Sequence, residues 1–414
     1  MIVMTEFNIT EKAEYLFVAL WALVLVAFFL LRWDMVYIVL PMLWLLFVAV
    51  FFFKPTLDVE VKRKLPHNRV LEGEVIDVEL QLKANERIPS LRVKDLLPEG
   101  LQVVEGSNSR VLSLRKGEES VLKYKVLVKR GVHPFESILL SYEDPFGLFH
   151  VDRTENIYQE LIGVPRIQEV PTPYSTRGTK ITVGPLPSPR VGEGVEFHAV
   201  REYQPGDPLK IINWKATART GRIMTNEYES ERKVDVIFIV DASYTGVMVF
   251  DDLVRAAASL MLNALHDGTS FGLLLAGEVP LWVRIDYGKR HFFKCIDFLS
   301  TAKPDVNNMI AYQVEHLIRS RFPPRAQLLY FSPLLTDESR DALKTMSEFG
   351  YNVVVISPNP YSAIEPKRRE EELALKLLSI ERKVVLQKMA SYGLIVDWDV
   401  KKPLKAAIAE VVNV

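Results

Sequence analysis

Two long apolar stretches open the chain, at residues 13–31 and 35–53. Glu14 is the one charge in the first stretch, and the second carries none. At a rise of 1.5 Å per residue, a helix over either stretch would be about 28 Å long, close to the roughly 30 Å hydrocarbon core of a bilayer. Because only residues 32–34 separate them, the pattern predicts a transmembrane helical hairpin within residues 1–55, with a buried helical pair of a soluble protein as the alternative.

Basic residues beside these stretches predict their orientation. The turn carries Arg32, whereas the other flanks carry Lys12, Lys54, Lys62, Arg63 and Lys64. Lys and Arg are enriched on the cytoplasmic side of membrane helices. We therefore expect a two-span cell-membrane protein in contact with the lipid bilayer, with all its soluble domains in the cytoplasm.

Between residues 56 and 152, apolar and polar positions alternate with a period of two, and turn signals containing glycine separate the segments. Alternation of this kind is typical of strands with one buried face. It predicts an all-β sandwich of immunoglobulin-like type. Six prolines between residues 163 and 190 then predict an extended connector at 153–190.

From residue 234 to the end, apolar strands alternate with helical patterns. Residues 234–241 read VDVIFIVD, an apolar run typical of a strand that is buried on both faces of a sheet. The alternation predicts a doubly wound α/β domain over residues 234–414. Within it, residues 279–286 (VPLWVRID) should form an antiparallel hairpin strand at a sheet edge.

Composition excludes several classes of protein. The chain of 414 residues has a formal net charge of −1, which gives no reason to expect a nucleic acid partner. Its single cysteine, Cys295, cannot form an intrachain disulfide, and its position on an amphipathic pattern favours a buried apolar role. The sequence contains no GxxxxGKS or GxxxxGKT phosphate loop and no GxSxG nucleophile motif. We therefore expect a protein that is not an enzyme.

Asp241, Ser243 and Thr245 follow the first strand of the α/β domain, at the edge where such sheets place their sites. One carboxylate and two hydroxyls at alternate positions could bind Mg²⁺ or Ca²⁺. The spacing resembles the metal-ion-dependent adhesion site of von Willebrand factor A domains, with Thr245 in place of the last serine. That family adds a threonine and an aspartate from two later loops, where this chain offers Asp305 and Asp337. The alternative is that Asp241 and Ser243 only cap a helix or order their loop.

The most distinctive segment covers residues 191–233 and mixes charges of both signs with aromatic residues. Such a mixture occurs both in solvated ion-pair networks and in protein-binding surfaces. The residues that define it are Glu196, Arg201, Tyr203, Gly206, Asp207, Trp214, Lys215, Arg219, Glu229 and Glu231.

These residues closely resemble the signature of domain-of-unknown-function family 58, which runs roughly GxGxEFxxxRxYxxGDxxRxIxWxAxARxGxLxxxxxExE. A second matching piece is DPFGLF, at residues 144–149. The chain departs from the family at Lys210, where arginine is usual, and at Asn213, where aspartate is usual. The resemblance implies a membrane protein with a von Willebrand A-like domain. It also implies a partner, because members often occur beside MoxR-type AAA+ ATPases and are thought to act with them.

Three functions follow as hypotheses. The first is a membrane-anchored, non-enzymatic scaffold or adaptor that presents the von Willebrand A-like domain and the signature segment to a cytoplasmic partner, a MoxR-type ATPase. The second is a metal-dependent adhesion or ligand-binding receptor centred on Asp241. The third is an unrecognised hydrolase that uses Glu196, Asp207 and Glu229.

Overall fold

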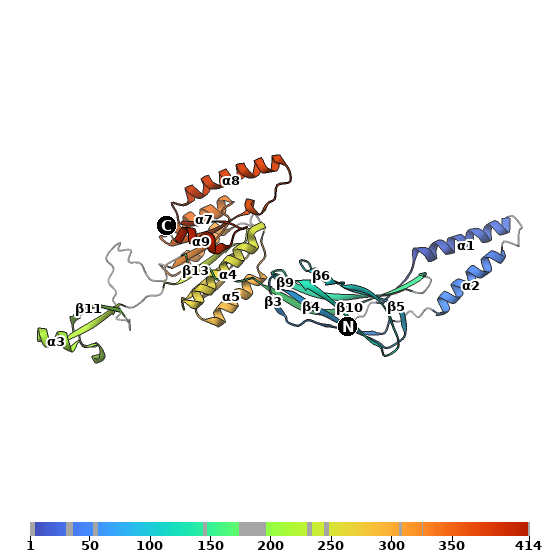
Figure 1. Ribbon diagram of the computed structural model, residues 1–414, viewed down its shortest axis with the longest axis horizontal. Helices are drawn as coiled ribbons and strands as arrows, with labels where there is room; N and C mark the ends of the chain where they lie inside the picture. Colours follow the sequence, from blue (N-terminus) through green and yellow to red (C-terminus); the bar gives the residue numbers. More distant parts are fainter. Residues whose placement is uncertain are drawn as a thin grey trace. The chain divides into compact units, whose positions relative to one another are not determined.

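The computed structural model describes residues 5–29, 36–52, 57–143, 147–173, 196–229, 234–243, 248–305, 309–324 and 326–412 (Figure 1). The chain divides into two compact units, Met1–Val164 and Pro165–Val414.

The first unit begins with a strand and two helices. Strand β1 (Thr5–Ile9) is followed by α1 (Glu11–Phe29) and α2 (Val36–Phe52). Ala13, Leu20 and Val39 from the two helices form a small buried cluster with Leu148 and Phe149. The start of α1 is therefore packed against the β-sheet part of the same unit.

The predicted membrane hairpin is wrong. No helix within the described ranges is both long enough and apolar enough to cross a membrane. Helix α2 has 17 residues, fewer than the ~20 that a crossing needs, and is therefore about 26 Å long, shorter than the roughly 30 Å hydrocarbon core. The first turn of α1 carries Glu11, Lys12 and Glu14, which leaves an uncharged part of only about 22 Å. The predicted two-span fold and cell-membrane localisation, with its cytoplasmic orientation, are overturned by the same finding.

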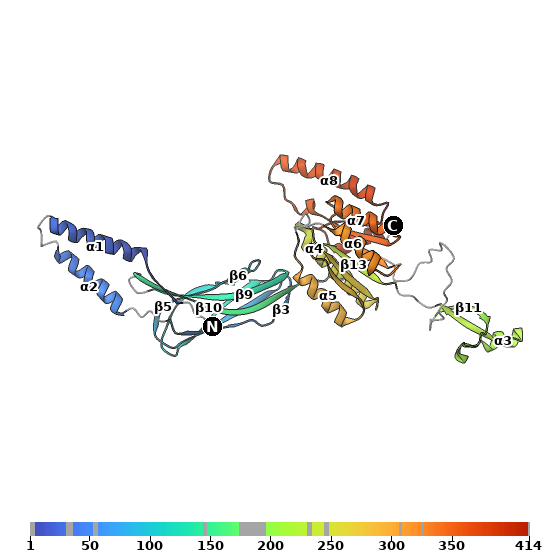
Figure 2. The same ribbon diagram turned by 180° about the vertical axis from the view of Figure 1, so that it is seen from behind.

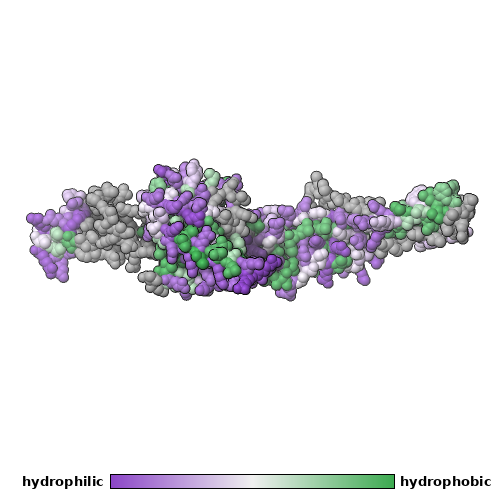
Figure 3. Space-filling model, turned by 90° about the horizontal axis from the view of Figure 1, so that it is seen from above, coloured by the Kyte–Doolittle hydropathy of each residue, from purple (hydrophilic) through white to green (hydrophobic). Residues whose placement is uncertain are grey.

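Apolar side chains nevertheless line these helices. Trp21 and Trp44 are 66% and 69% exposed, and Phe29 is 78% exposed. Figure 3 shows the apolar colouring gathered over this region. The two helices thus present a mostly apolar surface.

Two β-sheets form the rest of the first unit. The larger has the order β1-β10-β9-β5-β7, with β3 pairing in parallel with β10, and the smaller has the order β2-β4-β8-β6. Their strands are β2 (Val59–Lys64), β3 (Arg69–Leu71), β4 (Val75–Ala84), β5 (Ile88–Asp95), β6 (Gln102–Gly106), β7 (Ser109–Leu114), β8 (Glu119–Leu127), β9 (Gly131–Glu143) and β10 (Phe149–Val164). Apolar residues alternate with polar ones along β4, so that one face of this strand is buried. Leu80 and Leu122 of one sheet and Leu91 and Leu140 of the other share one core, which makes this body a sandwich.

The second unit is built on a six-stranded sheet of order β15-β14-β13-β16-β17-β18. Its strands are β13 (Val236–Asp241), β14 (Phe271–Ala276), β15 (Leu281–Asp286), β16 (Gln327–Phe331), β17 (Asn352–Asn359) and β18 (Leu394–Asp399). All pairings are parallel except that of β15 with β14, so the predicted antiparallel edge strand is confirmed. Every residue of β13 is buried, as its continuous apolar run predicts.

Helices cover this sheet (Figure 1, Figure 2). They are α4 (Phe250–His266), α5 (Lys289–Thr301), α6 (Ile310–Ser320), α7 (Asp337–Glu348), α8 (Arg369–Met389) and α9 (Leu404–Val412), with a short 3-10 turn η4 (Pro360–Ala363). Ile237 and Ile239 share a core cluster with residues of α6 and α7. Phe238 points the other way along β13 and stacks on Phe331, with 6.0 Å between ring centroids. The sheet is thus buried on both faces.

A small group of elements lies between residues 174–195 and 230–233, both of which fall outside the described residues, and we call this group the signature module (residues 196–229). It consists of β11 (Glu196–Glu202), η2 (Leu209–Ile211), α3 (Trp214–Thr220) and β12 (Met224–Glu229). Strands β11 and β12 pair antiparallel as a two-stranded sheet. This module carries most of the residues that the sequence singled out.

Candidate functional site

Local hydrogen bonds define the conformation of the signature module. Asn213 caps α3 by accepting a hydrogen bond from the Ala216 N–H (3.0 Å), and its amide donates to the Asn226 side chain on β12 (2.7 Å). Thr217 also links α3 to β12, because its hydroxyl accepts a hydrogen bond from the Met224 N–H at 3.0 Å. Gly221 ends the helix with a φ of 71°, a left-handed conformation that favours glycine. Asparagine at 213, where the family usually has aspartate, therefore still supplies a helix cap.

Arg201 and Asp207 form a bidentate ion pair within the module. Two guanidinium nitrogens donate to the two carboxylate oxygens, both at 2.8 Å. Asp207 also accepts from the Gln204 N–H at 2.9 Å, and Gly206 has a φ of 113°. The Arg201 hydrogen bond, with the Gln204 N–H second, holds the pKa of Asp207 below its usual value. The pair therefore closes the loop after β11 in one conformation.

Outward-facing residues of the module are of two kinds. Trp214 is 70% exposed, and Leu209 and Ile223 are 73% and 50% exposed. Lys215 and Arg219 are exposed one helical turn apart on α3, so they lie on the same face. Lys210 is also exposed, and within the described residues none of these three cations has an ion-pair partner. The module thus exposes both large apolar groups and positively charged side chains.

The remaining signature residues are placed as follows. Tyr203 is half-buried, and its N–H donates to the Ile223 carbonyl at 2.8 Å. Glu196 and Glu229 are directly opposite each other in the β11–β12 register. Glu231 lies outside the described residues. Because Asp207 is already paired with Arg201, it is poorly suited to act as the general base that the hydrolase hypothesis requires.

Asp241 occupies a second site, at the carboxyl end of β13. It is 1% exposed, and its two oxygens accept hydrogen bonds from the Ser243 N–H (3.0 Å) and the Ser332 hydroxyl (2.7 Å). Burial raises the pKa of Asp241, and the hydrogen bonds from Ser332 and Ser243 oppose that effect. Ser332 also accepts from the Leu334 N–H at 3.1 Å, so it joins the ends of β13 and β16.

The structure brings Asp305 next to this site. Ser243 and Asp305 form an isolated parallel bridge, and the Asp305 N–H donates to the Ala242 carbonyl at 2.6 Å. The Asp305 carboxylate accepts from the Glu278 N–H at 2.7 Å. Asp337, the other later carboxylate, is instead bonded to Arg340 and is 93% exposed. The second loop was therefore a correct candidate for the neighbourhood of Asp241, whereas Ser332 was missed as its partner.

Hard oxygen ligands are present here, but their bonding favours an ordered loop. Both Asp241 oxygens accept hydrogen bonds from the protein, which holds the carboxylate in place without a cation. Over the described ranges, no group of three or more His, Cys, Asp or Glu side chains is arranged to hold a metal ion. Thr245, the third predicted ligand, lies outside those ranges. The loop-ordering role is the one that these contacts support.

Cys295 is buried on α5, as its sequence pattern indicated. Burial raises the pKa of its thiol to about 12. A thiol of this kind is almost wholly protonated at neutral pH and is therefore a poor nucleophile.

Comparison with known proteins places these elements in a family context. Residues 199–359, from β11 to the end of β17, match the family described as "Protein of unknown function DUF58". This confirms the family resemblance over that range, which does not include the DPFGLF piece at residues 144–149. The "Uncharacterized protein YeaD" of Bacillus subtilis (strain 168) is 25% identical over 286 residues, covering 67% of this chain and 71% of that protein.

Similarity to solved structures is weak. A CARDB domain from Pyrococcus furiosus, titled as a complex with di-metal ions, covers 26% of this chain and 89% of its own, at 18% identity and a TM-score of 0.18. The mussel byssus proximal thread matrix protein 1 covers 43% of this chain and 44% of its own, at 15% identity and a TM-score of 0.28. Neither similarity carries an argument about this chain.

Proposed function

We propose that this protein is a non-enzymatic scaffold or adaptor whose signature module binds another protein. The family resemblance favours a MoxR-type AAA+ ATPase as that partner. The observation that carries the proposal is that Trp214, Lys215 and Arg219 are all exposed on one short helix of a hydrogen-bonded module.

The chemistry of the module supports protein binding. Tryptophan and arginine concentrate binding energy at protein interfaces, and a 70% exposed Trp214 gains from being covered. Lys210, Lys215 and Arg219 would favour a partner surface rich in carboxylates, because complementary charge speeds association and aligns the two surfaces.

The bonding of the module supports it as well. The Arg201–Asp207 pair and the Asn213 cap fix the backbone that carries Trp214 and its neighbours in one conformation before a partner binds. Binding then costs less conformational entropy than it would from a loosely ordered segment. Arg201 accordingly acts as a positioning residue, and Trp214 as a contact residue.

Direct binding between purified proteins tests the proposal. The full chain is immobilised and titrated with the MoxR-type ATPase of the same organism, with and without ATP. We expect Trp214→Ala and Lys215→Glu each to weaken binding by about tenfold or more, as interface contacts of these types do. Tyr312→Ala and Lys289→Glu are matched controls, since both residues are exposed on other helices. Unchanged affinity of the Trp214 variant, or no binding of the ATPase at all, would contradict the proposal.

A metal-dependent ligand-binding role is the second candidate. The pairing of Ser243 with Asp305 favours it, because it brings two oxygen-bearing residues beside Asp241. The hydrogen bonds that both Asp241 oxygens accept from the protein favour a loop-ordering role over metal binding. Thermal unfolding of the wild type and of Asp241→Ala, with and without Mg²⁺ or Ca²⁺, tests the metal-dependent role.

A further inference from the structure

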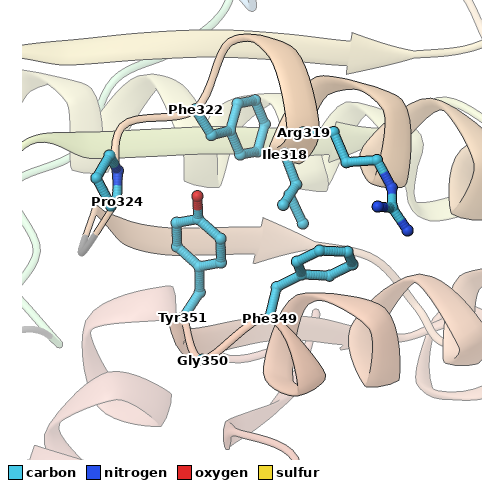
Figure 4. Close-up of a pocket in the computed structure, with 7 residues that line it drawn as sticks. All are labelled: Ile318, Arg319, Phe322, Pro324, Phe349, Gly350 and Tyr351. Atoms are coloured by element: carbon cyan, nitrogen blue, oxygen red, sulfur yellow. The ribbon is translucent and has the colours of Figure 1, made fainter.

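An aromatic pocket lies in the second unit, away from both sites described above. It has a volume of about 360 Å³. Ile318, Arg319 and Phe322 form one wall, from α6 and the residues after it, and Phe349 and Tyr351 form the other, from the residues between α7 and β17 (Figure 4). The pocket therefore opens where β16 and β17 begin, opposite the strand ends that carry Asp241 and Ser332.

The pocket has a firm base and an accessible rim. Phe322 is only 6% exposed and packs on Trp282, with 5.2 Å between ring centroids. It also meets Tyr351 edge to face at 6.4 Å. Phe349, in contrast, is 42% exposed. Buried rings thus preform the base, while Phe349 leaves an apolar face in contact with solvent.

Arg319 places a guanidinium group at the rim. Its guanidinium lies over the Phe349 ring, 5.1 Å from the centroid. Its Nε and Nη2 donate to one oxygen of Glu315, at 3.1 and 2.8 Å, and these bonds leave Nη1 unused. Among the described residues that line the pocket, Arg319 alone is charged. An occupant with a carboxylate at the rim would therefore be favoured over a neutral or basic one.

The geometry points to one occupant: we propose that this pocket binds an aromatic side chain of a partner protein that is followed by an acidic residue. The volume is near the lower limit for ligand sites, which suits one aromatic ring rather than a cofactor. Open α/β sheets place small-molecule sites at the carboxyl ends of their strands, and this pocket lies at the other edge. Aromatic and arginine side chains around a pocket are typical of binding hot spots between proteins.

In the bound state, the partner's ring would lie between Phe322 and Phe349, in the offset or edge-to-face arrangements that aromatic pairs prefer. The acidic side chain would accept from Arg319 at the rim. Glu315, which is half-exposed on the preceding turn of α6, would keep its bond to Nε or release it to the incoming carboxylate. The pocket shares no residue with the signature module, so this inference stands apart from the proposed function.

A fluorescently labelled, N-acetylated and C-amidated peptide with the central residues Gly-Phe-Asp-Gly tests the proposal by anisotropy against the full chain. We expect saturable binding that falls at least about tenfold when the peptide phenylalanine is replaced by alanine. Arg319→Gln should lower the affinity for the Asp-containing peptide by about fivefold and leave the affinity for the corresponding Asn-containing peptide unchanged. Arg321→Gln and Phe293→Ala are matched controls, since both residues are exposed and lie outside the pocket lining.

Several outcomes would overturn the inference. They are absence of saturable binding, equal affinity for the Asp and Asn peptides, and displacement of the peptide by free phenylacetate at the same concentration as by unlabelled peptide. The last result would indicate a small-molecule site. Phe349→Ala is expected to abolish binding. If the Phe349 variant is unstable, Arg319→Gln still tests the pocket, because the Arg319 side chain is 63% exposed and its replacement should not disturb the fold. Trp214→Ala should leave peptide binding unchanged, which separates this pocket from the signature module.

Discussion

Arg201 holds Asp207 through two parallel N–H···O bonds of 2.8 Å each, across a loop of only a few residues. The Gln204 N–H donates to the same carboxylate at 2.9 Å. Strand β11 ends at Glu202, and the Arg201–Asp207 pair then fixes the loop that leads from β11 to η2 and Trp214.

Loss of this pair should loosen the module locally. Because lysine cannot reproduce the two parallel bonds, we expect Arg201→Lys to increase amide exchange at Gln204 about tenfold, while exchange in β13 is unchanged. Hydrogen exchange followed by NMR or mass spectrometry measures this. Arg222→Lys is the matched control, since Arg222 and Glu202 form an exposed pair. Equal exchange in the Arg201 variant and the wild type would show that the pair does not order the loop.

Asp207 should titrate below its usual range. Its folded-state pKa is lowered by Arg201 first and by the Gln204 N–H second. A lowered pKa contributes stability that is present above the unfolded value of about 3.9 and is lost as the pH falls through the folded pKa. We expect carboxyl-carbon NMR to give a midpoint below 3.9, and Arg201→Gln to move it back upward. A midpoint at or above 3.9 in the wild type would contradict the paired geometry.

Arg63 and Asp95 form a buried ion pair in the first unit, and the loss of either partner should destabilise that unit strongly. Both side chains are 0% exposed, and the Tyr124 hydroxyl donates to Asp95 at 2.6 Å. Removing one partner of a buried pair leaves an uncompensated charge, so Arg63→Ala should cost about 3–5 kcal/mol in denaturant unfolding. Tyr124→Phe, which removes a hydrogen bond but no charge, should cost about 1–3 kcal/mol.

Lys83→Ala is the control for this series, because Lys83 and Glu119 pair on the surface, and we expect no measurable change from it. A loss for Arg63→Ala no greater than for the control would mean that the buried pair carries little of the stability of the first unit.

Asp241 should order its loop without a cation. Asp241→Asn removes the buried charge but retains an acceptor for the Ser243 N–H, so stability at neutral pH should stay within about 1 kcal/mol of wild type. Asp241→Ala leaves that N–H unpaired and should cost about 1–3 kcal/mol. Thermal unfolding with and without Mg²⁺ or Ca²⁺ measures both effects. A cation that raised the Tm of the wild type but not of Asp241→Ala would establish the metal-dependent alternative.

The alternation of apolar and polar residues located most of the sandwich and the α/β sheet, but it missed β1 and wrongly assigned residues 153–164, most of β10, to the connector. Period-two patterns such as that of β4 bury one face, and the unbroken run of β13 requires burial on both. The antiparallel edge strand β15 was also readable, because a short strand follows β14 closely. The apolar runs at the N-terminus were misleading, because hydrophobicity alone did not show where each helix begins and ends. Helix α1 begins at Glu11 and so has charged residues in its first turn, and α2 has only 17 residues.

The sites divide in the same way. The sequence by itself determined which residues carry chemistry and which are close along the chain, such as Arg201 and Asp207 or Asp241 and Ser243. Only the tertiary structure decided the long-range partners: Ser332 lies 91 residues from the carboxylate that it binds. It also decided that Trp214 is exposed and that Phe322 and Phe349 share a pocket. The physical reason is that periodicity reports which face of an element is apolar, whereas contacts between distant side chains depend on how the elements pack together.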